Sequence, residues 1–387
     1  MTSPLELAAV VSRARLDRTA RRRRRAVMAA SVPAVIAGTW VIAVAATGSW
    51  ARVQDNTVAG VTMVFGSLVA GSTPQGGGAV AFPVFTKVLD VSPEAARSFS
   101  LFIQTVGMGA ATATIVITRR PVVWRAVAIA LPAALVGFAM TIAWTTTDGA
   151  FLPSMVPGPY AKVIFNLVVV AIATFLWRTE RAALIERHNQ LPPLASGQFV
   201  AFGSAGLFGG ALSALVGSGA DVAVYLSLAA LFGLRPHVAI TTSVVIMTGV
   251  SAFGFVTLGL FGQQLFTPDG FDVPGMWLAA VPVVGLGAPL GAWFAARLAD
   301  RHLTALVLVL ALAELTTTAV LVQELHTDLT LLAFALLGLV MTVGAAGWLA
   351  ACGHPLANEG TDARGDVTEA SIDVAPGFDL SRLEPAP

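Results

Sequence analysis

The chain has 387 residues, of which 56% are hydrophobic and only 12% are charged, and its mean hydropathy is +0.78. Soluble domains carry about 25% charged residues, so this composition excludes an ordinary soluble domain and predicts a polytopic membrane protein. Because a span needs all of its backbone hydrogen bonds inside the segment, the expected fold is all-α. The lone Cys352 excludes an intrachain disulfide framework.

The two ends of the chain carry opposite charges, although the net charge is only +1. Residues 1–25 hold eight arginines against two acids, and the tail from Cys352 holds seven acids against two arginines. Because Lys and Arg mark the cytoplasmic side of membrane proteins, we interpret 1–26 as a basic cytoplasmic N-terminus rather than a nucleic-acid patch. The tail, 352–387, is poor in apolar residues, and we expect it to be a disordered acidic cytoplasmic segment.

The first apolar segment, 27–47, directly follows the basic cluster. It is longer than the 7–15-residue apolar core of a signal peptide, so it is interpreted as an uncleaved first transmembrane helix. Before it, Ser3, Pro4 and Glu6 form a pattern that is typical of a helix start. A basic helix on the membrane surface is therefore expected ahead of the first span.

Further apolar segments have the length of transmembrane helices. They lie at 95–117, 122–147, 161–177, 238–261, 276–296, 303–322 and 329–350. Two other segments, 58–90 and 198–233, are also apolar but are interrupted near their middle by glycines. In transporters, glycines and prolines that interrupt corresponding segments of two halves are pointers to the binding site.

The charges of the loops indicate how these segments cross the membrane. Basic loops and poorly basic loops alternate along the chain; the basic ones are 119–125, 178–188 and 297–302, and the others are 148–160, 267–273 and 323–328. The alternation holds only if each glycine segment returns to the side from which it entered. Each is then a broken or re-entrant helix pair, which is tolerated at membrane depth where protein or a water-filled cavity surrounds it. Both termini are then cytoplasmic.

The two halves repeat the same residues at one spacing. Pro93 and Pro236 are 143 positions apart, and the same offset relates Gly66 to Gly209, Gly76 to Gly219, Ala96 to Ala239, Ser100 to Ser243 and Thr105 to Thr248. We therefore expect a first repeat at 58–177, a cytoplasmic linker at 178–197 and a second repeat at 198–322. Corresponding loops fall on opposite sides, so the repeats are inverted, as in secondary transporters. Each is a glycine-containing helix pair followed by three transmembrane helices, with one extra helix at each end of the chain.

The breaks are suited to a small anion, because glycines let backbone N–H groups face a cavity and a helix start adds partial positive charge. The expected substrate-binding residues are those at the breaks and polar residues on the helices that follow. They are Gln75, Gly76, Gly77, Gly78, Arg97, Ser100 and Gln104 in the first half and Gly217, Ser218, Gly219, Thr242 and Ser243 in the second. For any single hydroxyl the alternative is helix packing, where Ser and Thr are common.

Three ionisable residues near the breaks have open roles. Arg97 either draws anions towards the site or snorkels to the interface beside nearby acids. Asp221 is a proton carrier, the partner of a buried arginine, or a hydrogen-bonded helix start. His237 is a second proton-coupling candidate near the second break. The five histidines are scattered, so no metal site is expected.

These motifs resemble a known family. Gly76-Gly77-Gly78 followed by Pro83 and Ser92-Pro93-Glu-Ala-Ala-Arg-Ser-Phe-Ser100, with Pro236-His-Val-Ala-Ile-Thr-Thr242-Ser243 in the second half, are similar to the TauE/SafE family of sulfite exporter-like permeases. The likeness spans about 58–322. It implies a bacterial inner-membrane permease for sulfite, an organosulfonate or a related sulfur oxyanion, without ATPase or redox domains.

The resemblance also implies which residues line or shape the path: Gly76, Gly77, Gly78, Pro93, Ser100, Gly217, Gly219, Pro236, Thr242 and Ser243. Two features depart from the family pattern. The second cluster reads Gly-Ser-Gly-Ala-Asp221 where Gly-x-Gly-Gly-Gly is typical, and Phe99 stands where a threonine usually precedes the serine. Asp221 would repel an anion unless it is protonated or paired.

The leading hypothesis is a secondary transporter, not an enzyme, that works by alternating access and is driven by the anion gradient or by protons. A second hypothesis is a proton- or metal-cation permease that uses Asp221. A remote third is an intramembrane hydrolase, because Gly217–Asp221 approaches the Gly-x-Gly-Asp of aspartyl proteases, although no second mid-helix aspartate is present. The expected partners are the lipid bilayer, a small anionic substrate and, as an option, a second copy in a homodimer. No nucleic acid and no cofactor are expected.

Overall fold

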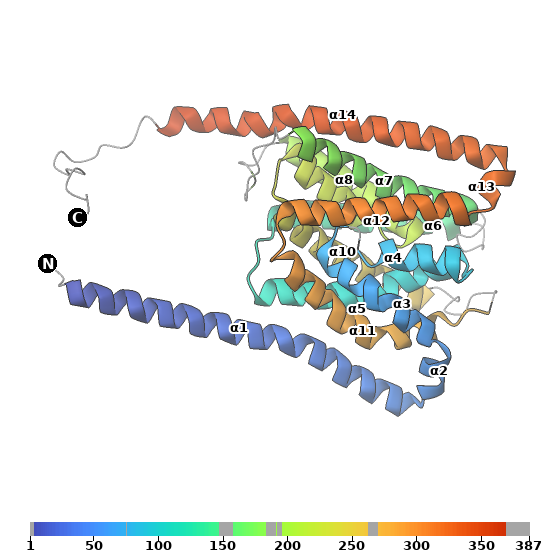
Figure 1. The fold of residues 1–387 in the computed structure, drawn as a ribbon, viewed down its shortest axis with the longest axis horizontal. Helices are drawn as coiled ribbons and strands as arrows, with labels where there is room; N and C mark the ends of the chain where they lie inside the picture. The colour runs from blue at the N-terminus through green and yellow to red at the C-terminus, as the bar shows by residue number, and fades with distance from the viewer. Residues whose placement is uncertain are drawn as a thin grey trace.

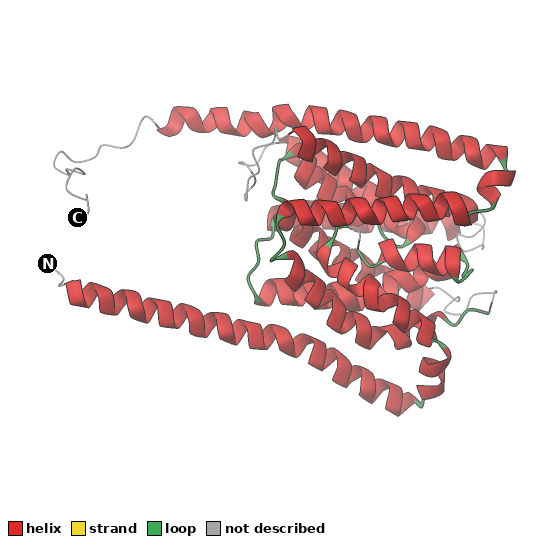
Figure 2. Cartoon of the chain, viewed as in Figure 1, coloured by secondary structure: helices red, strands yellow, loops and turns green. Residues whose placement is uncertain are grey.

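The computed structural model describes residues 4–74, 76–146, 158–182, 191, 196–261 and 270–368. This part of the chain is built from helices and contains no β-strand (Figure 2). Within it, nine helices are long and apolar enough to cross a membrane. The prediction of an all-α polytopic membrane protein is therefore confirmed.

Figure 1 shows the order and arrangement of the helices. The N-terminal half contains α1 Pro4–Thr47, α2 Trp50–Asp55, α3 Thr57–Ser72, α4 Gly78–Pro83, the π-helical turn η1 Val84–Val88, α5 Pro93–Ile117, α6 Trp124–Thr146 and α7 Gly158–Ala182. The C-terminal half contains α8 Ser196–Val216, α9 Ala220–Leu226, the π-helical turn η2 Ser227–Leu231, α10 Pro236–Phe261, α11 Val273–Ala295, α12 Asp300–Leu321, α13 Glu324–Thr327 and α14 Leu329–Thr368.

The order of elements in α3 to α7 is repeated in α8 to α12. The spacing of 143 residues relates the first residues of α5 and α10, Pro93 and Pro236, and also those of η1 and η2, Val84 and Ser227. Each glycine segment thus consists of one longer helix, a break, a short helix and a π-helical turn. The two π-helical turns were not expected from the sequence. The inverted relation of the two halves stays a prediction.

Each half packs one of its helices against the other half. Helix α3 packs on α11 of the other half, and its counterpart α8 packs on α6. A Cβ on Gly71 of α3 would lie 1.9 Å from Ala288 O, and a Cβ on Gly210 of α8 would lie 1.9 Å from Ala134 O. Only glycine lets the backbones come so close, which is the usual way for membrane helices to gain contact area.

The bundle has two distinct ends (Figure 1). Helix α1 begins and α14 ends at the same end, where Arg25, Arg120 and Arg297 line one cavity; this is named the basic end. Helices α2 and α13 lie at the opposite end (Figure 1). The two outer helices, α1 and α14, run along different sides of the bundle, so the repeated elements form its core.

Helix α1 differs from the expectation of a separate surface helix, which is wrong. Residues Pro4–Thr47 form one continuous helix that carries the basic cluster directly into the first span. No glycine or proline occurs between Pro4 and Pro33, and Ala, Leu and Arg are good helix formers, so nothing ends the helix at the arginines. Ser3 lies outside the described residues.

The start of the acidic tail also differs from the expectation of disorder. Helix α14 continues past the apolar span, as far as Thr368. Extending a helix costs less than nucleating one, so the helix that forms in the apolar span propagates into the tail. Residues 369–387 lie outside the described residues.

Candidate functional site

The two glycine breaks meet inside the bundle. Gly76 and Gly217 have φ angles of +65° and +82°, in the left-handed region that favours glycine. A Cβ on Gly78 would lie 2.9 Å from the Cβ of Ser218 and 3.0 Å from the Oγ of Ser100, so the first break lies against the second. We call this place the junction, formed by Gly76, Gly78, Ser100, Gln104, Gly217, Ser218 and Asp221.

Helix α5 supplies the polar side chains that hold the second break. The Nε2 of Gln104 donates to Gly217 O at 2.7 Å and to the Oγ of Ser100 at 2.8 Å. The Oγ of Ser100 donates to the same Gly217 O at 3.3 Å. Residues four apart lie on one face of a helix, so both side chains reach the carbonyl that the end of α8 leaves without a helical partner.

The same helix buries Arg97, which is 2% exposed. Its Nη1 donates to Ala214 O, at 3.5 Å, in the last turn of α8. A cation at a helix C-terminus is stabilised by the exposed carbonyls there. The alternative in which Arg97 snorkels to the interface is therefore wrong, and this arginine lies one turn of α5 before Ser100.

Asp221, at the start of α9, is fully buried. Its Oδ1 accepts hydrogen bonds from the N–H groups of Gly219 at 3.2 Å and Val222 at 3.0 Å and from the Oγ of Ser218 at 3.4 Å. One of the two carboxylate oxygens of Asp221 therefore makes the hydrogen bonds that are expected of a residue at a helix start.

The other oxygen of Asp221 faces a second acceptor. Within the described part of the chain, neither Asp221 Oδ2 nor Gln104 Oε1 has a hydrogen-bond partner. Measured from the point where a Cβ of Gly76 would lie, these atoms are 2.8 Å and 3.0 Å away. The Nε2 of Gln104 is fixed by three oxygen acceptors, so the amide orientation follows from the hydrogen-bond network. Two buried acceptors thus face the same point, where one donor or cation would satisfy both.

Of the remaining predicted residues, Thr242 and Ser243 lie outside the junction, whereas Gly77 and Gly219 lie at the breaks themselves. Thr242 Oγ1 accepts from Val123 N at 3.0 Å, next to the start of α6, and Ser243 Oγ donates to Ile240 O of its own helix at 3.0 Å. No described hydrogen bond ties these two hydroxyls to the junction. Gly77 and Gly219 precede α4 and α9 directly. Gln75 lies outside the described residues.

A cavity of about 410 Å³ opens at the basic end, and we call it the vestibule. It is lined among others by Arg120, His237 and Thr241, and it reaches Gly71 in the last turn of α3, just before the first break. Burial lowers the pKa of the Arg120 guanidinium, and the nearby positive charge of Arg297 lowers it further. His237 therefore lines the vestibule, which none of the junction residues lines.

A buried ion pair that the sequence analysis missed lies between η1 and α12. Lys87 Nζ donates to Glu314 Oε1 and, at 2.7 Å, to the Oγ1 of Thr318. Asn166 of α7 donates to the same hydroxyl at 2.9 Å. The side chains of Lys87 and Glu314 are only 1% and 5% exposed. The signal in the sequence was Glu314 itself, because an acid in the middle of an apolar segment is functional or paired.

A second ion pair joins α2 to the start of α11. Both the Nε and the Nη2 of Arg52 donate to the carboxylate of Asp272. Asp272 also caps α11, because its Oδ1 accepts from Gly275 N at 3.0 Å. This pair is partly exposed, at 34% and 25%. The connection between the first span and the first glycine segment is thereby fixed to the second half.

Metal ligands do not gather at any of these places. Within the described ranges, no group of three or more His, Cys, Asp and Glu side chains could hold a metal ion.

The family model described as "Sulfite exporter TauE/SafE" matches residues 58–314, which run from α3 into α12. No curated protein and no solved structure matches the chain. Helix α1, the later part of α12 and α14 lie outside the matched range.

Proposed function

Since this chain belongs to the sulfite exporter TauE/SafE family, we propose that it is a secondary permease that moves sulfite, or an organosulfonate or other sulfur oxyanion, through the junction. The observation that carries this proposal is the meeting of two glycine breaks inside a membrane bundle, with Ser100 and Gln104 at their contact. Two broken segments brought together between repeats are the site architecture of secondary transporters.

The chemistry of the junction supports an anion. Helix α4 begins at the first break, and the N–H groups of its first turn carry partial positive charge. At the start of α9, the N–H groups of Gly219 and Val222 already donate to Asp221 Oδ1, and that of Ala220 donates to Ser213 Oγ. In the vestibule, Arg120 and His237 add cationic and polar groups on the approach from the basic end. An anion would collect near Arg120, lose its water at the junction and exchange it for N–H and O–H donors.

The proposed anion path is more open towards the basic end of the bundle. The vestibule opens at the basic end, whereas η1 is tied near the other end by the buried pair of Lys87 and Glu314. In alternating access, one side of the site opens as the other closes. We therefore propose that this arrangement is the state open to the basic end, which by the positive-inside rule is the cytoplasm of a bacterial inner membrane.

Asp221 is proposed as the proton-coupling residue. A lone buried carboxylate is costly, and a proton on Oδ2 would neutralise Asp221 and supply the donor that Gln104 Oε1 lacks. It would also remove the repulsion between Asp221 and an entering anion. Proton binding and anion binding at the junction would then favour each other, which is the requirement for coupling. His237 lines the vestibule and would at most pass protons on.

The two unpartnered acceptors also favour a second candidate, a proton- or metal-cation permease. A cation between Asp221 Oδ2 and Gln104 Oε1 would satisfy both atoms. The intramembrane hydrolase has no such support, since none of the hydrogen bonds of Asp221 in the described chain comes from a second carboxylate.

Flux of radiolabelled sulfite into proteoliposomes of the purified full chain tests the proposal. The flux is measured with and without an imposed pH gradient and in competition with thiosulfate, taurine, sulfoacetate and chloride. We expect saturable flux that sulfur oxyanions inhibit and chloride does not, and that follows the pH gradient. Absence of flux with every one of these anions would remove the sulfur oxyanion assignment.

The variant Asp221→Asn separates the two candidates. A cation carrier loses its carboxylate and should stop transporting. An anion permease should keep its flux and lose only the response to the pH gradient, because the asparagine remains neutral. Gly109→Ala is a matched control on α5, since a Cβ there meets nothing within 4 Å. It should behave as the unchanged chain in both assays.

A further inference from the structure

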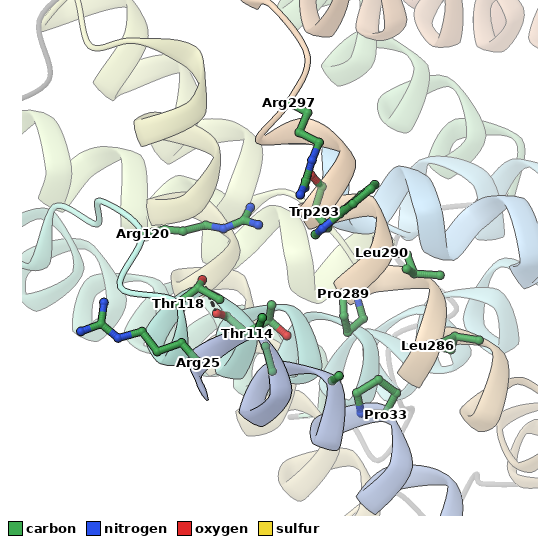
Figure 3. Close-up of a pocket in the computed structure, with 13 residues that line it drawn as sticks. Arg25, Pro33, Thr114, Thr118, Arg120, Leu286, Pro289, Leu290, Trp293 and Arg297 are labelled. Carbon is green, nitrogen blue, oxygen red and sulfur yellow. Dashed lines mark hydrogen bonds between the residues drawn. The ribbon is translucent and has the colours of Figure 1, made fainter. Parts of the chain in front are cut away.

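A second and larger cavity, of about 700 Å³, lies at the basic end between α1, α5 and α11 (Figure 3). It is bounded on one side by α1, which stands on the outside of the bundle (Figure 1). None of the junction residues lines it. The cavity therefore shares Arg120 with the vestibule but has a wall, formed by α1, that the proposed anion path does not use.

One part of this cavity is cationic. Arg25, Arg120 and Arg297 come from three different segments, and none of the described residues that line the cavity is acidic. Thr114 of α5 and Thr118, which caps the C-terminus of α5, also line it, and their hydroxyl groups donate to backbone oxygens of the same helix (Figure 3). An anion with several oxygen atoms is the matching ligand, because a guanidinium can donate to more than one of its oxygens.

Two of the arginines are held in place by α11. Arg120 donates to Ala292 O. Arg297 donates to Trp293 O at 3.1 Å, and its guanidinium lies 3.4 Å above the centre of the Trp293 ring. The positive charge of Arg297 also contributes to lowering the pKa of Arg120. A bound anion would relieve the repulsion between these two like charges.

The rest of the cavity is apolar. Ala29, Ala30 and Pro33 of α1 face Leu286 and Leu290 of α11 across it. Leu286 lies nine residues before the end of α11 at Ala295, or about 13 Å deeper at 1.5 Å per residue. The arginines lie at the basic end, and the apolar lining extends along α11 away from them (Figure 3).

We propose that this cavity is a binding site for an anionic phospholipid, whose phosphate lies between Arg25 and Arg297 and whose acyl chain lies between α1 and α11. Basic pockets between transmembrane helices recognise lipid headgroups in this way. A small free oxyanion would use the arginines but would leave the apolar lining unfilled. Charge and apolar depth together therefore favour the lipid over free phosphate.

One wall of this site belongs to a part of the chain that the family model does not cover. The matched range begins at residue 58, after α1 and α2, so Arg25 and the α1 wall are additions to the shared core. Helix α1 is tied to α11 closer to its other end, where Trp40 Nε1 donates to Leu278 O at 2.7 Å. The lipid would fill the space between α1 and the core at the basic end.

Native mass spectrometry of the purified full chain tests the site. Phosphatidylglycerol and phosphatidylcholine with identical acyl chains are titrated separately. We expect phosphatidylglycerol to bind more tightly, and Arg25→Gln with Arg297→Gln to weaken it about 25-fold, at about five-fold for each arginine. Arg24→Gln with Arg119→Gln is the matched control, because these exposed arginines at the same end do not line the cavity. The control should leave the affinity within about two-fold.

Three outcomes would overturn the proposal. One is equal affinity for the two lipids. Another is an unchanged phosphatidylglycerol affinity in the variant that lacks Arg25 and Arg297. The third is displacement of phosphatidylglycerol by inorganic phosphate or sulfite but not by potassium chloride of the same ionic strength, because the site would then belong to a free oxyanion. None of these readouts depends on sulfite transport.

Discussion

The two glycine segments place their charges differently. In the first, the break carries no charged residue, and Lys87 in η1 is paired with Glu314. In the second, the charged residue is Asp221 at the break itself, and η2 reads Ser-Leu-Ala-Ala-Leu without a charge. The paired charge ties one segment to α12, whereas the unpaired carboxylate oxygen of the other faces the junction.

The positions of Gly78 and Asp221 show why the halves differ. They correspond at the spacing of 143 residues, but a Cβ on Gly78 would come within 2.9 Å of Ser218. The contact between the breaks therefore leaves no room for a side chain on the first one. A chain that retained strict symmetry here would either lose its carboxylate or separate its breaks. We infer that the asymmetry gives the site a single titratable group.

The largest expected effect comes from breaking the paired charge. Lys87→Met or Glu314→Leu alone leaves one buried charge without its partner and should lower the free energy of unfolding by about 3–5 kcal/mol. The double variant should be close to the unchanged chain, since both charges are gone. The measurement is the unfolding temperature in detergent. A double variant as unstable as either single one would show that the pair is not the reason for the loss.

The next largest effect on stability is expected where α3 packs on α11 and α8 packs on α6. Gly71→Ala and Gly210→Ala each place a methyl group 1.9 Å from a backbone oxygen of the partner helix. Backbone cannot move as a side chain can, so each should cost about 3 kcal/mol of stability, and the two costs should be similar. Gly109→Ala should be neutral or slightly stabilising. Unequal losses, or none, in thermal unfolding would refute the reciprocal packing.

Replacing Asp221 by asparagine should have a smaller effect and should stabilise the protein instead of destabilising it. In Asp221→Asn, Oδ1 can keep its three hydrogen bonds while the new Nδ2 donates to Gln104 Oε1. One net hydrogen bond is worth about 1 kcal/mol, so the variant should unfold at a higher temperature. Asp221→Ala, which removes the acceptor for Gly219 and Val222, should unfold at a lower one. Destabilisation by asparagine would mean that Oδ2 has a cationic partner.

The smallest effect concerns the partly exposed pair of Arg52 and Asp272. Desolvation raises the pKa of Asp272, but the hydrogen bonds from Arg52 and Gly275 N and the charge of Arg52 outweigh it, so the pKa is lowered. A lowered pKa gives stability that is present above the unfolded value of about 3.9 and lost as the pH falls through the folded value. Exposed pairs contribute about 0.2–1 kcal/mol.

The pH dependence of unfolding checks this pair. The difference in unfolding temperature between the unchanged chain and Arg52→Gln should be present at neutral pH, shrink below about pH 4 and become smaller in high salt. Arg24→Gln, at an exposed position on α1, is the control and should show no such difference. A difference that persists well below pH 4 would exclude the carboxylate of Asp272 as its source.

Sequence alone predicted the fold class and most helix positions for clear reasons. Spans are fixed by the length of apolar segments, and α5 and α10 begin at Pro93 and Pro236, where proline is favoured as the first helical residue. The breaks were predicted because a cluster of glycines inside an apolar segment lowers its helix propensity and interrupts the helix there. The continuous α1 was missed because a basic cluster changes membrane depth but does not end a helix.

The side-chain contacts were not predictable in the same way. The pairing of Lys87 with Glu314 joins residues 227 positions apart, and it depends on how the two halves dock and how each helix is rotated. The same holds for Arg97, whose burial depends on where α8 ends, and for Thr242, which faces the start of α6. Periodicity and composition carry no information on such docking.

The sulfite flux of Gly78→Ala tests the central claim, that the contact of the two breaks is the path of the anion. The added methyl group enters the contact with Ser218 and Ser100, and Gly109→Ala on α5 is the control. Both variants are reconstituted at equal amounts of protein whose folding is verified by thermal unfolding. The account predicts that Gly78→Ala loses most of its flux and that Gly109→Ala retains it. Full flux through folded Gly78→Ala would contradict the account.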